Sequence, residues 1–195
     1  MKIYHVPGTR SIRPIWLCFE LDLPIEIEAI DPSEDYRASA EWRAISPAGK
    51  IPALRDGDLT MFESGAMVMY LLERYGQSRL QPPTGTAESA AFQQWCWFSE
   101  ATLIRPLGLA RMLRDSAAID QAARQKTLEA LNAVELGLQD RDFLLGATFS
   151  AADIMMGYSL HLLEKFKLLT DKQANSLSYL QRLRSRDACA RAFAA

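Results

Sequence analysis

The chain has 195 residues, 49% hydrophobic and 24% charged, with a formal net charge of −2. This globular composition excludes the disordered class, and the lack of a basic excess argues against a nucleic acid partner. The three cysteines are odd in number and far apart, which argues against a disulfide framework and suits a reducing compartment. Two histidines are too few for a metal cluster, and neither a signal peptide nor an apolar run of ~20 residues is visible. We therefore expect a soluble cytoplasmic protein with no metal and no membrane segment.

Two strands joined by a helix are predicted at the start of the chain. Residues 2–6 (KIYHV) are rich in β-forming side chains and precede a Pro-Gly turn. Apolar residues at helical spacing predict a helix that begins at or just after Ser11, which can serve as its N-cap. Residues 25–30 (IEIEAI) alternate strictly and predict a second strand, parallel to the first through a right-handed crossover.

The next segments predict a hairpin and a second long helix. Residues 51–54 and 59–62 flank an Asp-Gly turn signal and should form two strands. Helical spacing follows over residues 66–75, and Gly76 should stop that helix at a C′ position. The order strand, helix, strand, then strand, strand, helix predicts an α/β domain over residues 1–78.

The rest of the chain predicts helices only. Residues 79–86 contain Pro82-Pro83 and a glycine, which is typical of a linker, and residues 87–195 show no convincing strand. The fold class is therefore α/β plus all-α. The expected helices are a long one over 87–115 with a break near 106–108, a second over 116–140, a buried one over 150–164 and a final one over 176–193.

The turn between the first strand and the first helix carries two hydroxyls, Thr9 and Ser11. A helix N-terminus stabilises an anion such as a thiolate, and a hydroxyl that donates to sulfur favours the charged form. The same residues also suit an ordinary turn and helix cap, and this segment alone favours that interpretation. No cysteine of the chain lies in the turn, so a reacting thiol would have to arrive on a ligand.

Two later segments carry further candidate contacts. A cis Pro52 would turn the Ile51 backbone towards a ligand, although trans is the default for such bonds. Lys50 could hold a carboxylate or be simply solvated. Ser64 would cap a helix and could bind a ligand carboxylate, while Glu63 could pair with a ligand ammonium.

The order and spacing of four segments resemble the glutathione transferase family, in its bacterial cytosolic type, over the whole chain. The segments are PGTRSIRPIW (7–16), SPAGKIPAL (46–54), FESGAMVMYLLERYG (62–76) and GATFSAADIMM (146–156). The resemblance implies a thioredoxin-like domain before an all-helical domain, with glutathione as co-substrate. In the last segment Ser150 and Asp153 predict a capping box, so Asp153 should be structural.

The resemblance also implies the glutathione contacts. Pro52 is then the cis proline, and Ile51 pairs through its backbone with the cysteinyl unit. Glu63 and Ser64 take the γ-glutamyl end, and Lys50 reaches towards the glycyl carboxylate.

The activating group should come from the turn. Thr9 occupies the place of the catalytic serine in delta- and theta-like members of the family. Arg10 occupies the place of the catalytic cysteine in beta-like bacterial members, so that cysteine chemistry is absent. The R-S-x-R pattern around Ser11 resembles a serine-type subgroup of fungi and bacteria. Ser11 and Thr9 are both candidates for the catalytic hydroxyl, with a slight preference for Ser11.

The acceptor site is expected between the two domains. Its candidate lining consists of basic and aromatic side chains, although aromatic residues there also suit a core. The candidates are Arg10, Trp97, Arg105 and Arg111, with Trp95 and Phe98 as further aromatics.

Three functions remain open on this sequence. The main hypothesis is transfer of the glutathione sulfur to a small apolar electrophile, by thiolate stabilisation and proximity. A second is glutathione-dependent reduction of disulfides or peroxides, and a third is a non-catalytic binding or scaffold protein of the same fold. A homodimer is expected by analogy. The acceptor and the natural role, whether detoxification, catabolism or redox repair, stay open.

Overall fold

The computed structural model describes residues 1–113 and 117–195. Contacts between residues divide the chain into two compact units. The first unit joins Met1–Arg79 with Ser185–Ala195, and the second comprises Leu80–Arg184. Residues 185–195 thus pack with the α/β part of the chain, whereas the sequence pattern groups them with the helices of 87–195.

A four-stranded sheet organises the first unit, in the order β2-β1-β3-β4. The strands are β1 (Lys2–His5), β2 (Glu26–Ala29), β3 (Ala53–Asp56) and β4 (Leu59–Phe62). β1 and β2 are parallel, as predicted, while β3 runs antiparallel to both β1 and β4. β3 begins two residues later than the predicted strand, because Pro52 has no N–H to donate to a neighbouring strand. The hairpin turn has Gly57 at φ +59°, which favours glycine.

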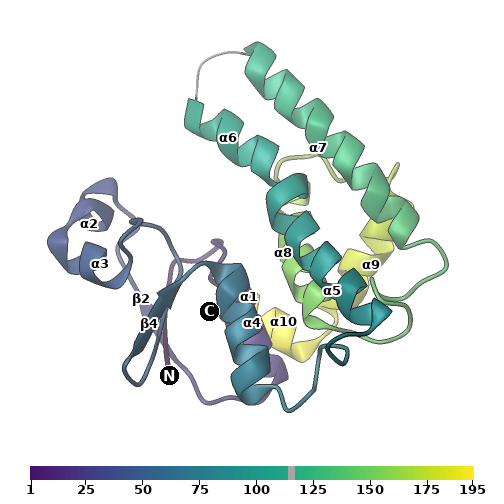
Figure 1. Ribbon diagram of the computed structural model, residues 1–195. Coiled ribbons are helices and arrows are strands. Elements are labelled where there is room, and N and C mark those ends of the chain that lie inside the picture. The colour runs from purple at the N-terminus through teal and green to yellow at the C-terminus, as the bar shows by residue number, and fades with distance from the viewer. Residues whose placement is uncertain (114–116) are drawn as a thin grey trace. The chain divides into compact units, whose positions relative to one another are not determined.

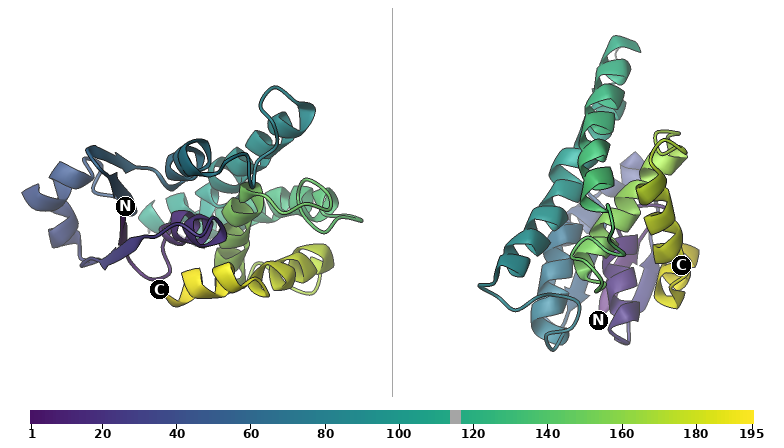
Figure 2. Two further views of the ribbon diagram at one scale, coloured as in Figure 1. Left: turned by 90° about the horizontal axis from the view of Figure 1, so that it is seen from below. Right: turned by 90° about the vertical axis from the view of Figure 1, so that its right-hand side faces the viewer.

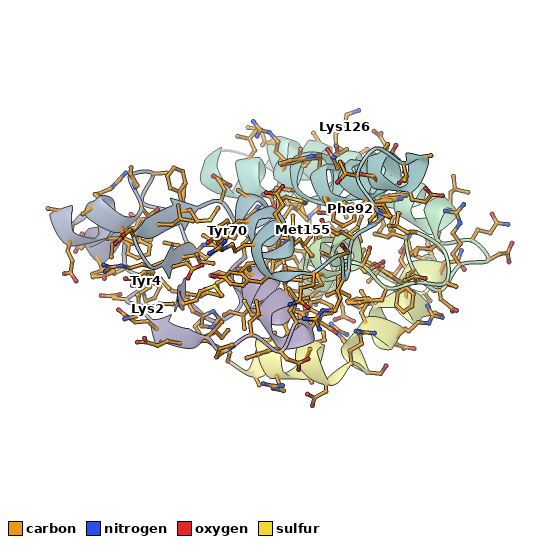
Figure 3. The ribbon with its side chains drawn as sticks, turned by 60° about the horizontal axis from the view of Figure 1, so that its bottom comes forward. Lys2, Tyr4, Tyr70, Phe92, Lys126 and Met155 are labelled. Carbon is orange, nitrogen blue, oxygen red and sulfur yellow. The ribbon has the colours of Figure 1, made fainter. Side chains whose placement is uncertain are left out.

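Helices cover both faces of this sheet (Figure 1). α1 (Ile12–Glu20) and α4 (Ser64–Tyr75) pack against each other on one face. The short helices α2 (Glu34–Ala38) and α3 (Ala40–Ile45) lie on the other face, where Trp42 packs edge-on against Tyr4 at 5.6 Å between ring centroids. Lys2 lies near Tyr4 on β1, with Nζ 5.9 Å from the ring centre (Figure 3).

The C-terminal segment forms two helices where the sequence pattern predicts one. α9 (Ala174–Arg184) ends, and α10 (Asp187–Ala194) begins after Arg186 at the N-cap position with an extended backbone. α10 runs alongside α1 in the first unit, with Phe193 against Trp16 at 6.3 Å (Figure 2). The predicted single helix over 176–193 is therefore wrong, because its two halves are buried in different units.

The second unit contains α5 (Ala87–Trp97), the π-helix η1 (Phe98–Leu103), α6 (Arg105–Leu113), α7 (Ala117–Gly137), α8 (Ala151–Lys165) and α9. Every residue of α8 from Ala151 to Leu160 is buried, which confirms the predicted central helix. Phe92 of α5 and Met155 of α8 are both part of this core (Figure 3). The predicted break near 106–108 falls earlier, at η1, and Pro106 lies in the first turn of α6, where proline is tolerated.

Asp153 anchors the start of α8, as the capping-box pattern predicts. Its buried carboxylate accepts hydrogen bonds from the backbone N–H of Ser150 at 2.8 Å and of Leu144 at 2.9 Å. The Tyr179 hydroxyl donates to it at 2.7 Å. These contacts give Asp153 a structural role. In the described part of the chain, no helix is long and apolar enough to cross a bilayer.

Candidate active site

The predicted contact residues meet at one end of the sheet in the first unit. Tyr4 pairs with Ala53, and Ala53 pairs with Phe62. Continuing this register by one residue puts Pro52 beside His5 and Glu63 beside Pro52. Three segments that are far apart in the sequence therefore converge where β1 ends, β3 begins and β4 ends.

Two helices begin at this same end of the sheet. α1 follows β1 after the turn of residues 6–11, and α4 starts directly after β4. The first turn of each helix leaves backbone N–H groups without helical acceptors and carries a partial positive charge. The convergence of two such ends makes this part of the unit attractive to anions.

The two hydroxyls of the turn differ in exposure. Thr9 is half-buried, whereas Ser11 is completely buried. Their oxygens lie 2.7 Å apart, and the Thr9 hydroxyl donates to the carbonyl oxygen of Val6 at 2.8 Å. Ser11 occupies the N-cap position of α1, but its backbone is already helical and its side chain makes no capping hydrogen bond. The interpretation of Ser11 as a side-chain cap is therefore wrong, because its hydroxyl is directed to other partners.

One of those partners is His5, which the sequence pattern did not single out. His5 is 2% exposed, and its Nδ1 lies 2.7 Å from Ser11 Oγ. Its other ring nitrogen, Nε2, lies 3.1 Å from the backbone oxygen of Ala195. Burial lowers the pKa of His5, against the opposing effect of the Ala195 contact, so that the ring is neutral near pH 7. The only sequence sign was its place at the end of a strand, just before the hydroxyl-bearing turn.

The loop before β3 is fixed by a buried serine. The Ser46 hydroxyl donates to the Lys50 carbonyl at 2.9 Å and accepts from the Lys50 N–H at 3.3 Å. Gly49 has φ +62°, and a Cβ there would lie 2.9 Å from the Arg37 carbonyl oxygen. The Ile51–Pro52 peptide bond is cis, as the resemblance implied. The loop therefore presents the exposed Lys50 from a defined backbone.

Glu63 and Ser64 join β4 to α4. Ser64 was expected to cap α4 but is its first residue, and the exposed Glu63 takes the N-cap position with φ +76° and ψ 106°. Ser64 is 4% exposed and accepts a hydrogen bond from Arg13 Nη1 at 3.3 Å. The Arg13 side chain is completely buried, so α1 contributes a desolvated cation next to the start of α4.

The cysteines of the chain are poorly suited to act as nucleophiles here. Cys18, Cys96 and Cys189 are buried and form no disulfide, and burial raises the pKa of the Cys18 thiol to about 12. A thiolate is the reactive form, so a reacting thiol at this site has to come from a ligand. Among the described residues, no three His, Cys, Asp or Glu side chains gather into a group that could hold a metal ion.

The candidates for an acceptor site belong to both units. Arg10 lies in the half-buried part of the turn in the first unit. In the second unit, Trp97 is 54% exposed and Arg105 is exposed. The side chain of Arg111 lies outside the described residues. Trp95 is buried and packs on Phe98 at 5.5 Å between ring centroids, which makes it part of the core of the second unit.

Comparison with known proteins supports the family resemblance noted in the sequence. The glutathione S-transferase N-terminal domain matches residues 3–79, and the C-terminal domain of that family matches residues 106–189. Glutathione S-transferase GstB of Escherichia coli is 31% identical over 87% of this chain and 85% of its own length. Glutathione S-transferase 3 of Schizosaccharomyces pombe is 26% identical over 96% of this chain and 84% of its own.

A solved structure extends the comparison to three dimensions. The chain superimposes on BphK, a bacterial glutathione transferase solved as a ternary complex, with a TM-score of 0.90 and 26% identity. The match covers 100% of this chain and 98% of BphK. Because both domains match in order and GstB is 31% identical over 85% of its length, the chain belongs to the glutathione S-transferase family.

Proposed function

We propose that this glutathione transferase joins reduced glutathione to small apolar electrophiles, with the glutathione thiolate held at the N-terminal end of α1. The observation that carries the proposal is the convergence of two helix N-termini and the Thr9 hydroxyl at one end of the sheet. Such a position stabilises a thiolate and can bring the pKa of a thiol from ~8.5 into roughly 3.5–7.5.

The remaining contacts distribute over the length of glutathione. Ser64 accepts a hydrogen bond from Arg13, which leaves the Ser64 O–H proton to donate to the γ-glutamyl carboxylate, while Glu63 takes the amine. Ile51 pairs with the cysteinyl backbone, and Lys50 receives the glycyl carboxylate. This assignment is supported by the buried Arg13 cation, since a desolvated charge attracts an anion more strongly than a solvated one.

Burial favours Thr9 over Ser11 as the group that touches sulfur. A ligand can approach the half-buried Thr9, but Ser11 has no exposed surface and lies behind it. Thr9 therefore donates to the thiolate, and Ser11 is a positioning residue for Thr9. This assignment reverses the preference for Ser11 that the sequence alone suggested.

The acceptor, the assembly and the location are supported by simpler observations. The exposed Trp97 offers an apolar surface for an electrophile, and Arg10, Arg105 and Arg111 stay candidates for its polar groups. The three buried cysteines form no disulfide, which suits a reducing cytoplasm. A homodimer fits the exposed Leu59 and Phe62 on the edge strand β4, because pairing would cover them.

Replacing Thr9 by valine tests the proposal, because valine keeps the shape and removes the hydroxyl. A hydrogen bond to a charged group contributes about 1.5–3 kcal/mol, so Thr9→Val should raise the pKa of the bound thiol by about one to two units. Its kcat/KM with an aryl halide near pH 7 should fall about 10- to 100-fold. The measurement is the rate of conjugate formation, with Thr9→Ser as the matched control that retains most of the activity.

The same assays distinguish the alternatives. Turnover of a model disulfide with none of aryl halides would favour the reductase. Glutathione binding without any turnover would favour a binding protein. Equal rates for Thr9→Val and the wild type would show that another group activates the thiol.

A further inference from the structure

A continuous line of hydrogen bonds leads inward from the surface of the site. Thr9 Oγ1 lies 2.7 Å from Ser11 Oγ, and Ser11 Oγ lies 2.7 Å from His5 Nδ1. His5 Nε2 lies 3.1 Å from the Ala195 backbone oxygen. Neither the sheet nor the glutathione contacts require a titratable ring at position 5.

The direction of these hydrogen bonds follows from their inner end. A backbone oxygen only accepts, so His5 Nε2 carries the proton that faces Ala195. The neutral ring then accepts at Nδ1, which requires Ser11 to donate to it. The relay requires Ser11 Oγ to accept in turn from Thr9. In the empty site the Thr9 hydroxyl donates to the Val6 carbonyl oxygen at 2.8 Å, so it turns from Val6 to Ser11 when the thiol binds, while the Val6 oxygen keeps the Thr9 N–H as a donor at 3.2 Å.

We propose that Thr9, Ser11 and His5 form a proton relay that moves the thiol proton of glutathione to His5 Nδ1. The inference rests on the proposed function and deepens it. The thiol proton passes to Thr9 Oγ1, the Thr9 proton passes to Ser11 Oγ, and the Ser11 proton passes to His5 Nδ1. One S–H bond breaks, one N–H bond forms, and no electrons are transferred. The products are a thiolate and an imidazolium, so the net charge of the site does not change.

After the transfer every group in the relay has a partner. Both hydroxyls have reversed direction, so Thr9 donates to the thiolate and Ser11 donates to Thr9. The imidazolium donates from Nδ1 to Ser11 and from Nε2 to Ala195. Paired thiolates and imidazoliums are stable in proteins, as in papain, where the histidine-paired cysteine has a pKa of about 3–4.

Groups from three parts of the described chain contact His5. Its contacts are the Ser11 hydroxyl on the α1 side, the Ala195 backbone oxygen after α10, and Ala29 on the neighbouring strand β2. The charged side chains on the elements packed around it are Lys2, Glu26 and Glu28 in β1 and β2, Arg55 and Asp56 in β3, Arg13 and Glu20 in α1, and Asp187 and Arg191 in α10. Lys2 pairs with Glu26 and Glu28, and Arg191 pairs with Asp187. The new thiolate is an opposite charge that favours the imidazolium.

Counting protons tests the relay. Thiolate formation is followed by its ultraviolet absorbance, and proton release by calorimetry in two buffers of different ionisation enthalpy. S-methylglutathione has no thiol proton, so its binding measures the protons that other groups release. This number is subtracted from the number of protons released when glutathione binds. The wild type should form the thiolate with almost no net proton release. His5→Asn and Ser11→Ala should release about one proton per thiolate formed, and their bound thiol should have a pKa at least about one unit higher, equal to a tenfold loss of thiolate at a fixed pH below that pKa.

The second histidine provides the matched control. His161 lies on α8 in the second unit and contacts Arg184, so His161→Gln should leave the proton count unchanged. The wild type also allows a test without substitutions. The NMR shifts of the His5 ring should report an imidazolium with glutathione and a neutral ring with S-methylglutathione.

Two results would overturn the relay. Thiolate formation with full proton release by the wild type would disprove it while leaving the proposed function standing, as would a ring that stays neutral with glutathione. Absence of any thiolate in the wild type would overturn the relay and the proposed function together.

Discussion

Glu63 is the residue whose conformation most directly suggests a ligand. With φ +76° and ψ 106° it occupies a region of backbone space that costs a non-glycine residue about 1–3 kcal/mol. Such conformations persist where surrounding structure or function requires them. If the exposed Glu63 carboxylate binds the glutathione amine, this function explains why the backbone strain at Glu63 is retained.

Glu63→Gly should therefore stabilise the protein and weaken glutathione binding. Relief of the strain, less the entropy that glycine loses on folding, amounts to about 1 kcal/mol, which raises Tm by about 2–4 °C in a chain of this size. Thermal unfolding and glutathione titration give the two quantities. Glu63→Gln is the control, since it keeps the strain and loses the charge, and should weaken binding without a gain in Tm. A glycine variant that is less stable, or that binds glutathione as well as the wild type, would contradict this account.

At the level of elements, the sequence pattern correctly predicted helices, strands and caps that depend on neighbouring residues. The alternating IEIEAI segment forms β2, and the apolar segment after Ser150 forms the buried α8. The capping box of Ser150 and Asp153 forms as its spacing indicates. Gly76 ends α4 as predicted, but with φ −70° rather than in a left-handed C′ conformation. A Cβ on Gly76 would lie 2.4 Å from the Leu72 carbonyl oxygen, so close approach explains the glycine.

Contacts between segments that are far apart in the sequence could not be predicted from such patterns. The hydroxyl of Ser11 bonds to His5, six residues away across a turn, rather than to the helix that it precedes. Arg13 reaches Ser64, and His5 reaches Ala195 at the other end of the chain. Residues 185–195 return to the first unit because α1 offers a surface for them, which no periodicity in 176–193 reveals. The predicted glutathione contacts came from the family resemblance rather than from spacing.

An ion pair fastens α10 to α1. Arg186 donates to both carboxylate oxygens of Glu20, at 2.7 and 2.6 Å, and Trp16 Nε1 donates to Glu20 at 2.9 Å. The Glu20 side chain is only 9% exposed. Loss of Arg186 would leave this carboxylate with little solvation and one fewer partner.

Arg186→Ala should lower the free energy of unfolding of the first unit by about 1–3 kcal/mol. The expected observation is faster hydrogen exchange of the α1 amides. The control is Lys126→Ala, which removes an exposed ion pair with Glu129 in the second unit and should leave the exchange of the α1 amides unchanged. If α1 exchanged at the same rate in Arg186→Ala as in the wild type, Phe193 and its apolar neighbours would be sufficient to hold α10 in place.

On the scale of the whole molecule, the first unit is built from both ends of the chain. Residues 1–79 supply the sheet and the predicted glutathione contacts, and residues 185–195 supply α10 and the backbone oxygen that His5 contacts. The helical unit, residues 80–184, is continuous in sequence. The predicted site thus includes a contact to Ala195, whereas the family's C-terminal domain matches the chain only up to residue 189.

The most direct test of the central claim is a glutathione titration of the wild type near pH 7, followed by the ultraviolet absorbance of the thiolate. The account predicts that bound glutathione is largely ionised, because the site brings the thiol pKa well below its ordinary ~8.5. Binding without thiolate absorbance, or no binding at millimolar glutathione, would contradict the claim that this end of the sheet binds and activates the glutathione thiol.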